Sequence, residues 1–168
     1  MRKFTKNGKH ILFLCHSALI AALYTVLTVL VGSFGLASGV IQVRISEALC
    51  ILPIFTPAAI PGLTLGCLLS NLLLSALWQD VLFGTLATLL GALGAYLLRK
   101  HAWAAPIPTV LANTLIIPPV LAYAYGFEGG LPFFALTVGL GEIISAYLLG
   151  LVLYFALKPH ANRLFRKI

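Results

Sequence analysis

Long apolar segments are the feature that most restricts how this chain can fold. The first extends from about Ile11 to Val31 and contains no Asp, Glu, Lys or Arg. An α-helix needs roughly 20 predominantly apolar residues to cross a bilayer. Because 61% of the 168 residues are hydrophobic and only 9% are charged, a water-soluble domain of this size could not bury its apolar surface. The sequence therefore predicts an all-α integral membrane protein of the cell membrane.

Breaks rich in glycine, proline or polar residues divide the apolar sequence into a predicted bundle of six transmembrane helices. Together they form a single predicted transmembrane domain over residues 1–168, with spans at about 11–31, 43–56, 61–77, 81–98, 106–124 and 131–157. The second predicted span is short and contains two charged residues and a proline. A merged or re-entrant second and third span is therefore an alternative, and it leaves the orientation of the chain unchanged.

The distribution of positive charge predicts that orientation. The net charge is +7, and ten of the eleven Lys and Arg residues lie in short polar segments at the ends of apolar runs: Arg2, Lys3, Lys6, Lys9, Arg99, Lys100, Lys158, Arg163, Arg166 and Lys167. Lys and Arg near membrane spans favour the cytoplasmic side. We therefore expect both the N- and the C-terminus in the cytoplasm. A nucleic-acid partner is disfavoured, because that requires cations interleaved with aromatic residues on one surface.

Beyond the positively charged segments, four charged residues lie at or inside the predicted spans: Arg44, Glu47, Asp80 and Glu142. An ionised side chain at the centre of a transmembrane helix costs about 2.5–3.5 kcal/mol on insertion scales, and such residues usually face the bundle interior or a water-filled cavity. Three amide side chains accompany them: Asn71, Gln79 and Asn113. Together these residues predict a polar, substrate-binding cavity that opens to the outside.

Structural roles are open for several of these residues. Arg44 and Glu47 are three residues apart, so they share a helix face and could form a salt bridge. Asn71 and Asn113 could instead form hydrogen bonds between helices. Glu142 has no cation near it in the sequence. A proton relay is another role open to a buried carboxylate of this kind.

Small residues predict where the helices pack. They recur every fourth position in two segments, at Gly62, Gly66 and Ser70 and at Gly84, Thr88 and Ala92. In lipid, close approach of helix backbones at small residues is a main source of helix association. The pair Pro118–Pro119 predicts either a simple kink or a broken helix that lines a cavity.

Motifs for several kinds of chemistry are missing from the sequence. There is no G-x-x-x-x-G-K-[ST] phosphate-binding loop, no H-E-x-x-H metalloprotease motif and no G-x-S-x-G nucleophile elbow. The three cysteines, Cys15, Cys50 and Cys67, fit no metal-binding spacing and are expected to be small buried hydrophobic residues. The sequence therefore predicts no catalytic residues, no metal and no cofactor, and an enzyme is disfavoured.

Three stretches of the chain resemble the QueT family of queuosine-precursor transporters. They are residues 41–49 (Ile-Gln-Val-Arg-Ile-Ser-Glu-Ala-Leu), residues 60–67 (Ile-Pro-Gly-Leu-Thr-Leu-Gly-Cys) followed by Asn71, and residues 80–89 (Asp-Val-Leu-Phe-Gly-Thr-Leu-Ala-Thr-Leu). The similarity covers most of the chain, and the Val-Arg-Ile-Ser-Glu-Ala part is the most specific. Members of this family are substrate-binding S components of energy-coupling-factor (ECF) vitamin transporters.

The resemblance implies a six-helix protein that captures a deazaguanine base or a related queuosine precursor from outside. It also implies a partner module made of a transmembrane T component and two cytoplasmic ATPases. S components that resemble this chain dock through an Ala-x-x-x-Ala face on the first helix, and Ala18 and Ala22 match that pattern.

The predicted site suits such a ligand. A guanine-like edge presents a ring N–H beside an exocyclic amine, and one carboxylate can accept both, which favours Glu142 or Glu47. Asn71, Gln79 or Asn113 would then address the ligand carbonyl. An aminomethyl precursor is cationic, so Asp80 or the second glutamate could neutralise it, and Arg44 completes the predicted set. The glycine- and serine-rich segment 32–39 resembles a lid.

Two other functions remain as alternatives at this stage. One is a self-sufficient, proton-coupled carrier of small solutes that uses Glu142 as its proton site. The other is a membrane enzyme or assembly factor in which the polar residues have a structural role.

Overall fold

The computed structural model describes residues 6–33, 44–74, 76–126 and 130–165. Within these ranges the protein is helical, with no β-strand. Most of the predicted lid, residues 34–39, lies outside the described residues, as do four of the terminal cations, Arg2, Lys3, Arg166 and Lys167.

Four helices of the described chain are long and apolar enough to cross a membrane. The first is α1 (Lys6–Ser33), and the second is α3 (Trp78–Leu97). The third consists of α4 (Ile107–Pro119) and the π-helical turn η2 (Val120–Ala124). The fourth is a continuous arm built from α5 (Leu131–Glu142), the π-helical turn η3 (Ile143–Leu148), α6 (Leu149–Leu157), η4 (Lys158–His160) and α7 (Ala161–Leu164).

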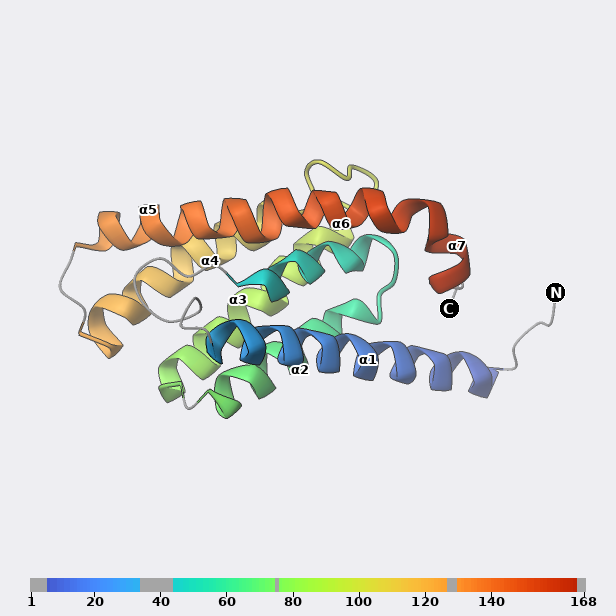
Figure 1. The fold of residues 1–168 in the computed structure, drawn as a ribbon, viewed down its shortest axis with the longest axis horizontal. Coiled ribbons are helices and arrows are strands. Elements are labelled where there is room, and N and C mark those ends of the chain that lie inside the picture. Colours follow the sequence, from blue (N-terminus) through green and yellow to red (C-terminus); the bar gives the residue numbers. More distant parts are fainter. Residues whose placement is uncertain (1–5, 34–43, 75, 127–129, 166–168) are drawn as a thin grey trace.

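Two further apolar helices are shorter than a membrane span. The 3₁₀-helix η1 (Ile45–Ile54) has 10 residues and α2 (Ala59–Leu73) has 15, which correspond to lengths of about 20 Å and about 22 Å. The hydrocarbon core of a bilayer is about 30 Å thick. The six expected apolar helices are thus present among the described residues. Four of them have spanning length, and the two shorter ones, η1 and α2, run antiparallel as a hairpin (Figure 1).

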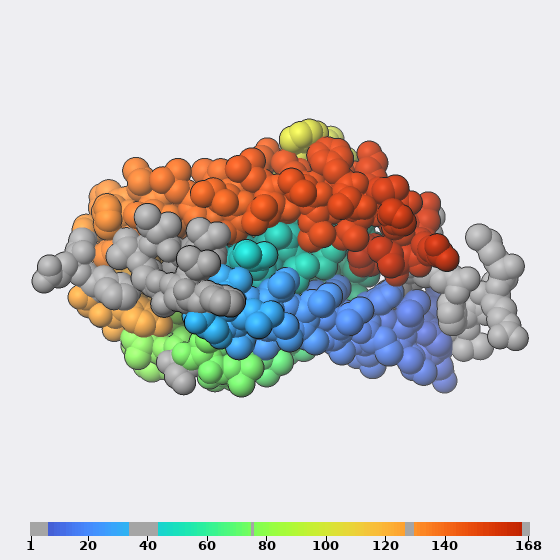
Figure 2. Space-filling view, in the orientation of Figure 1, coloured from blue at the N-terminus to red at the C-terminus, as the bar shows by residue number. Residues whose placement is uncertain are grey.

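The first arm of the hairpin, η1, is enclosed by the rest of the molecule. Every residue of η1 from Ser46 to Pro53 is buried. The helix contacts α1, α2, α3, η3 and α6, and Figure 2 shows it between α1 and the C-terminal arm. A helix that is apolar around its whole circumference is stable when other helices cover it. A short helix is sufficient here because η1 packs against protein on its sides.

Glycines set the packing of α2 against α1. A Cβ atom added at Gly62 would lie 2.8 Å from the Ser17 carbonyl oxygen, and one at Gly66 would lie 2.7 Å from Tyr24 Cβ. The Ser17 hydroxyl also donates a hydrogen bond to the Ala58 carbonyl at 2.9 Å. The predicted stripe of small residues on this segment is thus a helix interface, in which even a methyl group would be too large.

The stripe predicted on α3 is buried, but the closest contact of α3 with α4 lies beside it. Gly84, Thr88 and Ala92 are buried. A Cβ atom at Gly91 would lie 2.8 Å from Thr109 Cα, and one at Gly94 would lie 2.4 Å from Pro108 Cβ. The closest contacts of α3 with α4 are therefore made at Gly91 and Gly94, which do not belong to the predicted four-residue repeat.

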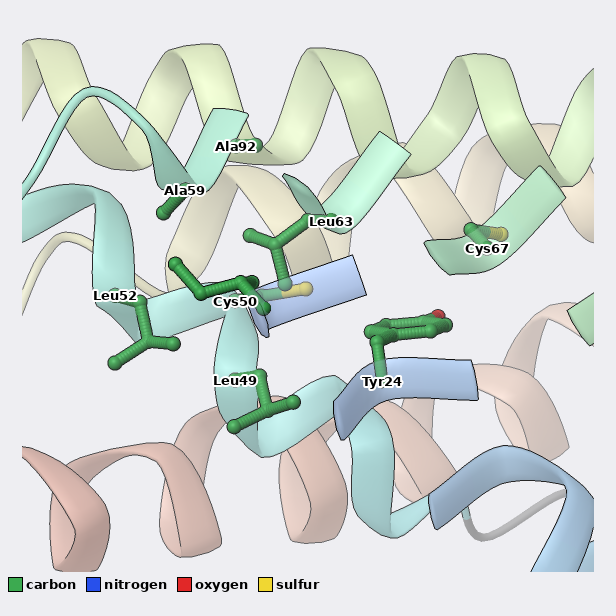
Figure 3. Close-up of a cluster of buried hydrophobic side chains, with 9 residues drawn as sticks. Tyr24, Leu49, Cys50, Leu52, Ala59, Leu63, Cys67 and Ala92 are labelled. Atoms are coloured by element: carbon green, nitrogen blue, oxygen red, sulfur yellow. The ribbon is translucent and has the colours of Figure 1, made fainter. Parts of the chain in front are cut away.

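The central apolar cluster joins α1, the hairpin and α3. Figure 3 shows Tyr24, Leu49, Cys50, Leu52, Ala59, Leu63, Cys67 and Ala92 in this cluster. Cys50 and Cys67 are buried there, as expected, whereas Cys15 is exposed on the outside of α1. The expectation for Cys15 is therefore wrong, because this part of α1 turns its Cys15 face away from the bundle.

Aromatic side chains lie near one end of the bundle. The first turns of α1 lie at the same end as α7 (Figure 1). Near this end, Phe55 of the hairpin turn stacks on Tyr154 and on Phe165, with ring centroids 5.4 Å and 5.3 Å apart. His16 of α1 meets the edge of Phe165. Half-buried aromatic rings thus pack together near the end where the described chain begins and finishes.

Candidate functional site

Glu47 lies in the interior of the protein and is held by two neighbours. It follows the start of η1 and is only 1% exposed. The Tyr24 hydroxyl from α1 donates a hydrogen bond to Glu47 Oε1. The Cys50 thiol, one turn further along η1, donates to Glu47 Oε2 at 3.1 Å. Each carboxylate oxygen of Glu47 therefore has a protein donor.

Arg44 pairs with a residue of another helix. Its Nη2 lies 3.9 Å from Asp80 Oδ2, at the first turn of α3, and both side chains are largely buried. The predicted alternative of a salt bridge between Arg44 and Glu47 is wrong for the described structure, because the guanidinium is directed toward α3. This ion pair connects the segment that precedes η1 to the beginning of α3.

Asp80 is also the acceptor for a tyrosine that the sequence did not single out as a site residue. The Tyr125 hydroxyl donates to Asp80 Oδ2 at 3.1 Å and accepts a hydrogen bond from the Leu77 backbone N–H at 3.4 Å. Partial burial, reinforced by the negative charge of Asp80, raises the pKa of Tyr125. The phenol therefore stays protonated and remains a hydrogen-bond donor to Asp80.

Asn71 supports the same group of residues from α2. It is 2% exposed. Its Nδ2 donates to the Asp80 carbonyl at 3.4 Å and lies 3.6 Å from the Cys67 sulfur. The interhelical role that the sequence left open for Asn71 is thus present in the structure. Arg44, Asn71, Asp80 and Tyr125 form one polar group that links η1, α2, α3 and the end of η2.

Glu142 and Asn113 form the other part of the interior polar region. Glu142 is the last residue of α5 and is 8% exposed, and Asn113 of α4 is 5% exposed. The two side chains are neighbours, and Glu142 also interacts electrostatically with Glu47 and Arg44. Asn113 is near enough to act on the Glu142 carboxylate, but within the described chain neither Glu142 Oε2 nor Asn113 Nδ2 has a partner at hydrogen-bond distance. The charges of the two glutamates, on η1 and at the end of α5, therefore interact inside the bundle.

The helix changes form directly after Glu142. The turn η3 is π-helical, and Ser145 within it is 1% exposed with no hydrogen-bond partner for its hydroxyl among the described residues. π-Helical turns inside α-helices occur frequently at functional sites. Ser145 is not evident from the sequence, because a single serine in an apolar run carries no signal of its own.

Gln79 lies apart from these residues. It lines an apolar groove of about 500 Å³ between α3 and the α4–η2 helix, and the residues that share this groove are Phe83, Leu86, Ile116, Pro119, Val120, Tyr123 and Ala124. The groove contains neither glutamate. The Pro118–Pro119 pair stays within the helix, which becomes π-helical at Val120. Of the two prolines, Pro119 lines this groove and Pro118 is buried.

The predicted partner-docking residues lie on the outer surface of α1. Ala18 and Ala22 are both exposed on α1, four residues apart, so they share one face. Among the described residues, no group of three or more His, Cys, Asp or Glu side chains is arranged to hold a metal ion.

Comparison with known proteins identifies the family. A family model described as QueT transporter matches residues 14–159. The queuosine precursor transporter QueT of Lactococcus lactis subsp. cremoris (strain MG1363) is 43% identical to this chain over 72 residues, which are 43% of this chain and 42% of that protein. The match thus spans less than half of the relative's length. No solved structure shows a significant match. Because the family model covers most of the sequence and the four long apolar helices are those of an integral membrane protein, the chain belongs to the QueT transporter family.

Proposed function

We propose that this chain is the substrate-binding S component of an ECF importer and that it captures a queuosine precursor, a deazaguanine base, from outside the cell. The relative with 43% identity is a queuosine precursor transporter. The observation that carries the proposal is the pair of Glu142 and Asn113, two buried side chains with unpaired polar atoms inside the bundle. A buried polar group without a partner is costly, and a polar solute would supply the missing hydrogen bonds.

The chemistry of this pair fits a guanine-like edge. A carboxylate accepts hydrogen bonds and an amide nitrogen donates them. Glu142 would accept the ring N–H and the exocyclic amine of the base, while Asn113 would donate to its carbonyl. Glu47 and Arg44 set the electrostatic environment of Glu142. Asp80 and Asn71, which adjoin Arg44, and Gln79, in the apolar groove, complete the predicted set.

The proposed orientation places the end of the bundle near these aromatic rings of Phe55, Tyr154 and Phe165 on the cytoplasmic side. The cations at both ends of the chain favour the cytoplasm, and the first turns of α1 lie at the same end as α7. The polar region of Glu142 and Arg44 would then be reached from the outside of the cell membrane.

Energy for uptake would come from a partner. The chain contains no phosphate-binding loop, and its one Gly-Lys dipeptide is Gly8-Lys9, which lacks the rest of that motif. We propose that a transmembrane T component and two cytoplasmic ATPases form the partner module. The T component would contact the exposed Ala18 and Ala22 face of α1, where small side chains allow a close approach of helices.

Calorimetric titration of the purified chain tests the proposed substrate. The panel comprises several deazaguanine bases together with riboflavin, thiamine and biotin. We expect heat only from deazaguanines. If every deazaguanine is silent and one of the vitamins binds, the substrate assignment is wrong. Copurification of the tagged chain with ATPase subunits tests the partner module separately.

A second candidate function is a self-sufficient proton-coupled carrier. The buried position of Glu142 without a hydrogen-bonded partner at Oε2 favours it, since such a carboxylate could exchange a proton. Liposomes that contain only this chain discriminate between the two. Uptake driven by an imposed pH gradient supports the carrier, whereas uptake that requires ATP and the partner module supports the S component.

A further inference from the structure

The interior carboxylates differ in how their oxygens are occupied. Glu47 has a donor at each oxygen, the Tyr24 hydroxyl and the Cys50 thiol. Glu142 Oε2 has no hydrogen-bond partner among the residues that the structure describes. Because Tyr24 is 0% exposed and its hydroxyl is directed to Glu47, this contact belongs to the packed interior. The two glutamates therefore differ in the hydrogen bonds that their carboxylate oxygens accept from the protein.

Three buried side chains of α4 and the C-terminal arm each have a polar atom with no hydrogen-bond partner among the described residues. These atoms are Glu142 Oε2, Asn113 Nδ2 and the Ser145 hydroxyl oxygen, and all three residues are at least nine-tenths buried. Glu142 and Ser145 lie on the buried face of the C-terminal arm, which Gly141 and Ala146 also form. The turn η3 that carries Ser145 contacts both α4 and η1. The set offers one acceptor, one donor and one hydroxyl that can act as either.

The charges in this region favour N–H donors as ligand groups. Three acidic residues, Glu47, Asp80 and Glu142, surround Arg44, and the guanidinium pairs with Asp80. Arg44 also acts on Glu142 from a distance, but among the described residues no cation forms an ion pair with Glu142. A buried carboxylate needs donors or a counter-charge to remain ionised. A ligand edge with two adjacent N–H groups would supply them.

We propose that Glu142, Asn113 and Ser145 contact the ligand directly, and that Glu47, held by Tyr24 and Cys50, is a positioning residue. This assignment rests on the proposed function and deepens it. Glu142 accepts hydrogen bonds from the exocyclic amine and the adjacent ring N–H of the base. Asn113 and Ser145 bind the remaining polar atoms. Glu47 instead fixes η1 and keeps the electrostatic environment of Glu142 negative.

Binding of two probe bases to the full chain tests the assignment. The probes are 7-deazaguanine and 7-deazahypoxanthine, which lacks the exocyclic amine. Wild-type protein should prefer 7-deazaguanine at least about tenfold, the value of one hydrogen bond to a charged group. Glu142→Gln should bring this preference to within about threefold. Glu47→Gln should weaken both probes by a similar factor and leave the preference intact.

Ser145 has a matched control in the same protein. Ser70 is equally buried, but its hydroxyl donates to the Cys67 carbonyl at 3.0 Å. Ser145→Ala should weaken 7-deazaguanine binding by about three- to tenfold, and Ser70→Ala should leave the affinity within about twofold. If a buried water rather than the ligand satisfies the three groups, Ser145→Ala and Ser70→Ala should bind 7-deazaguanine with the same affinity. That result would contradict a direct contact between Ser145 and the ligand.

The outcomes separate the assignment from the function on which it rests. If wild-type protein binds neither base, the deazaguanine substrate is wrong. If it binds 7-deazaguanine with the expected preference and Glu142→Gln keeps that preference, the substrate stands and the assignment is wrong. Loss of the preference in Glu47→Gln would also overturn the assignment. Where Glu142→Gln does not yield folded protein, Glu142→Asp retains the charge with a shorter reach and should likewise reduce the preference.

Discussion

Arg44 pairs with Asp80 of α3, with Nη2 3.9 Å from Oδ2, although Glu47 lies only three residues away on the adjoining helix. Because Arg44 pairs with Asp80, the Glu47 carboxylate accepts its hydrogen bonds from Tyr24 and Cys50. It also makes Asp80 a shared acceptor, because the Tyr125 hydroxyl binds the same carboxylate oxygen at 3.1 Å. One ion pair therefore couples the start of η1 to α3 and to the end of η2.

We expect Asp80→Asn to destabilise the protein. The substitution removes the negative partner of Arg44 and weakens the acceptor for Tyr125. The free energy of unfolding should fall by about 1–3 kcal/mol, the cost of leaving a largely buried charged group poorly paired. Thermal unfolding in detergent would measure the change. Lys100→Gln, at an exposed position between α3 and α4, is the control and should unfold at the wild-type temperature.

Tyr125 should make stability depend on pH at the alkaline end. Burial and the charge of Asp80 raise its pKa in the folded protein above the ordinary value of 10.0. A group with a raised folded pKa contributes stability that is complete below the unfolded pKa and is lost as the pH rises through the folded pKa. The difference in unfolding temperature between wild type and Tyr125→Phe should therefore shrink above about pH 10. A difference that stays constant from pH 7 to pH 11 would contradict this expectation.

Tyr24→Phe tests the contact that holds Glu47. Loss of the hydroxyl leaves Glu47 Oε1 without its donor in a fully buried place. The expected loss of stability is about 1–3 kcal/mol. Tyr123→Phe provides the comparison, since Tyr123 is 79% exposed and should tolerate the same chemical change. Equal unfolding temperatures for the two variants would mean that the Tyr24 hydroxyl does not stabilise Glu47.

The contact of α1 with α2 should not accept a larger residue at Gly66. A Cβ atom there would lie 2.7 Å from Tyr24 Cβ, so the two helices would have to separate. We expect Gly66→Ala to lower the free energy of unfolding by about 1–3 kcal/mol. At Gly150 the nearest atom, the Ala48 carbonyl oxygen, is 3.6 Å away from the added Cβ. Gly150→Ala should therefore be nearly neutral in the same thermal assay.

The exposed face of α1 gives a test of the proposed partner. Ala22→Trp adds a large side chain to a position that is already exposed, so the isolated protein should fold and bind 7-deazaguanine as the wild type does. Copurification with the T component should be lost, because the close approach of helices needs small residues. Leu97→Trp on α3, where Leu97 is 76% exposed, should retain the partner. Retention of the T component by Ala22→Trp would contradict the proposed interface.

The long helices could be predicted from the sequence because an apolar run of spanning length has few other stable conformations. An apolar run alone does not fix the structure of the segment around η1. Its apolar character predicted a membrane span at 43–56, but the structure encloses a 3₁₀-helix of 10 residues within the bundle. Hydrophobicity alone does not distinguish contact with lipid from contact with other helices, since both surroundings are apolar.

The candidate site residues were also predictable only in part. Glu47, Asp80 and Glu142 stand out in the sequence because charged residues are rare in membrane spans, and the structure buries all three. The sequence could not reveal which partner each one has, because Arg44 and Asp80 are far apart along the chain and meet only through the relative register of two helices. Tyr125 and Ser145 gave no sequence signal, since a tyrosine near a helix end and a serine in an apolar helix are both common.

The π-helical turn η3 gives the C-terminal arm a rotation that a regular α-helix would lack. A wide turn of this kind contains one more residue than the α-helical turn it replaces. A regular α-helix through the same residues would rotate everything beyond this turn by about 100°. Gly150 now lies against Ala48 and Ile51 of η1, and in such a helix it would turn away from them while Glu142 stayed in place. Because the wide turn absorbs the additional residue, deletion of Ile144 should restore a regular helix and leave Gly150 against η1.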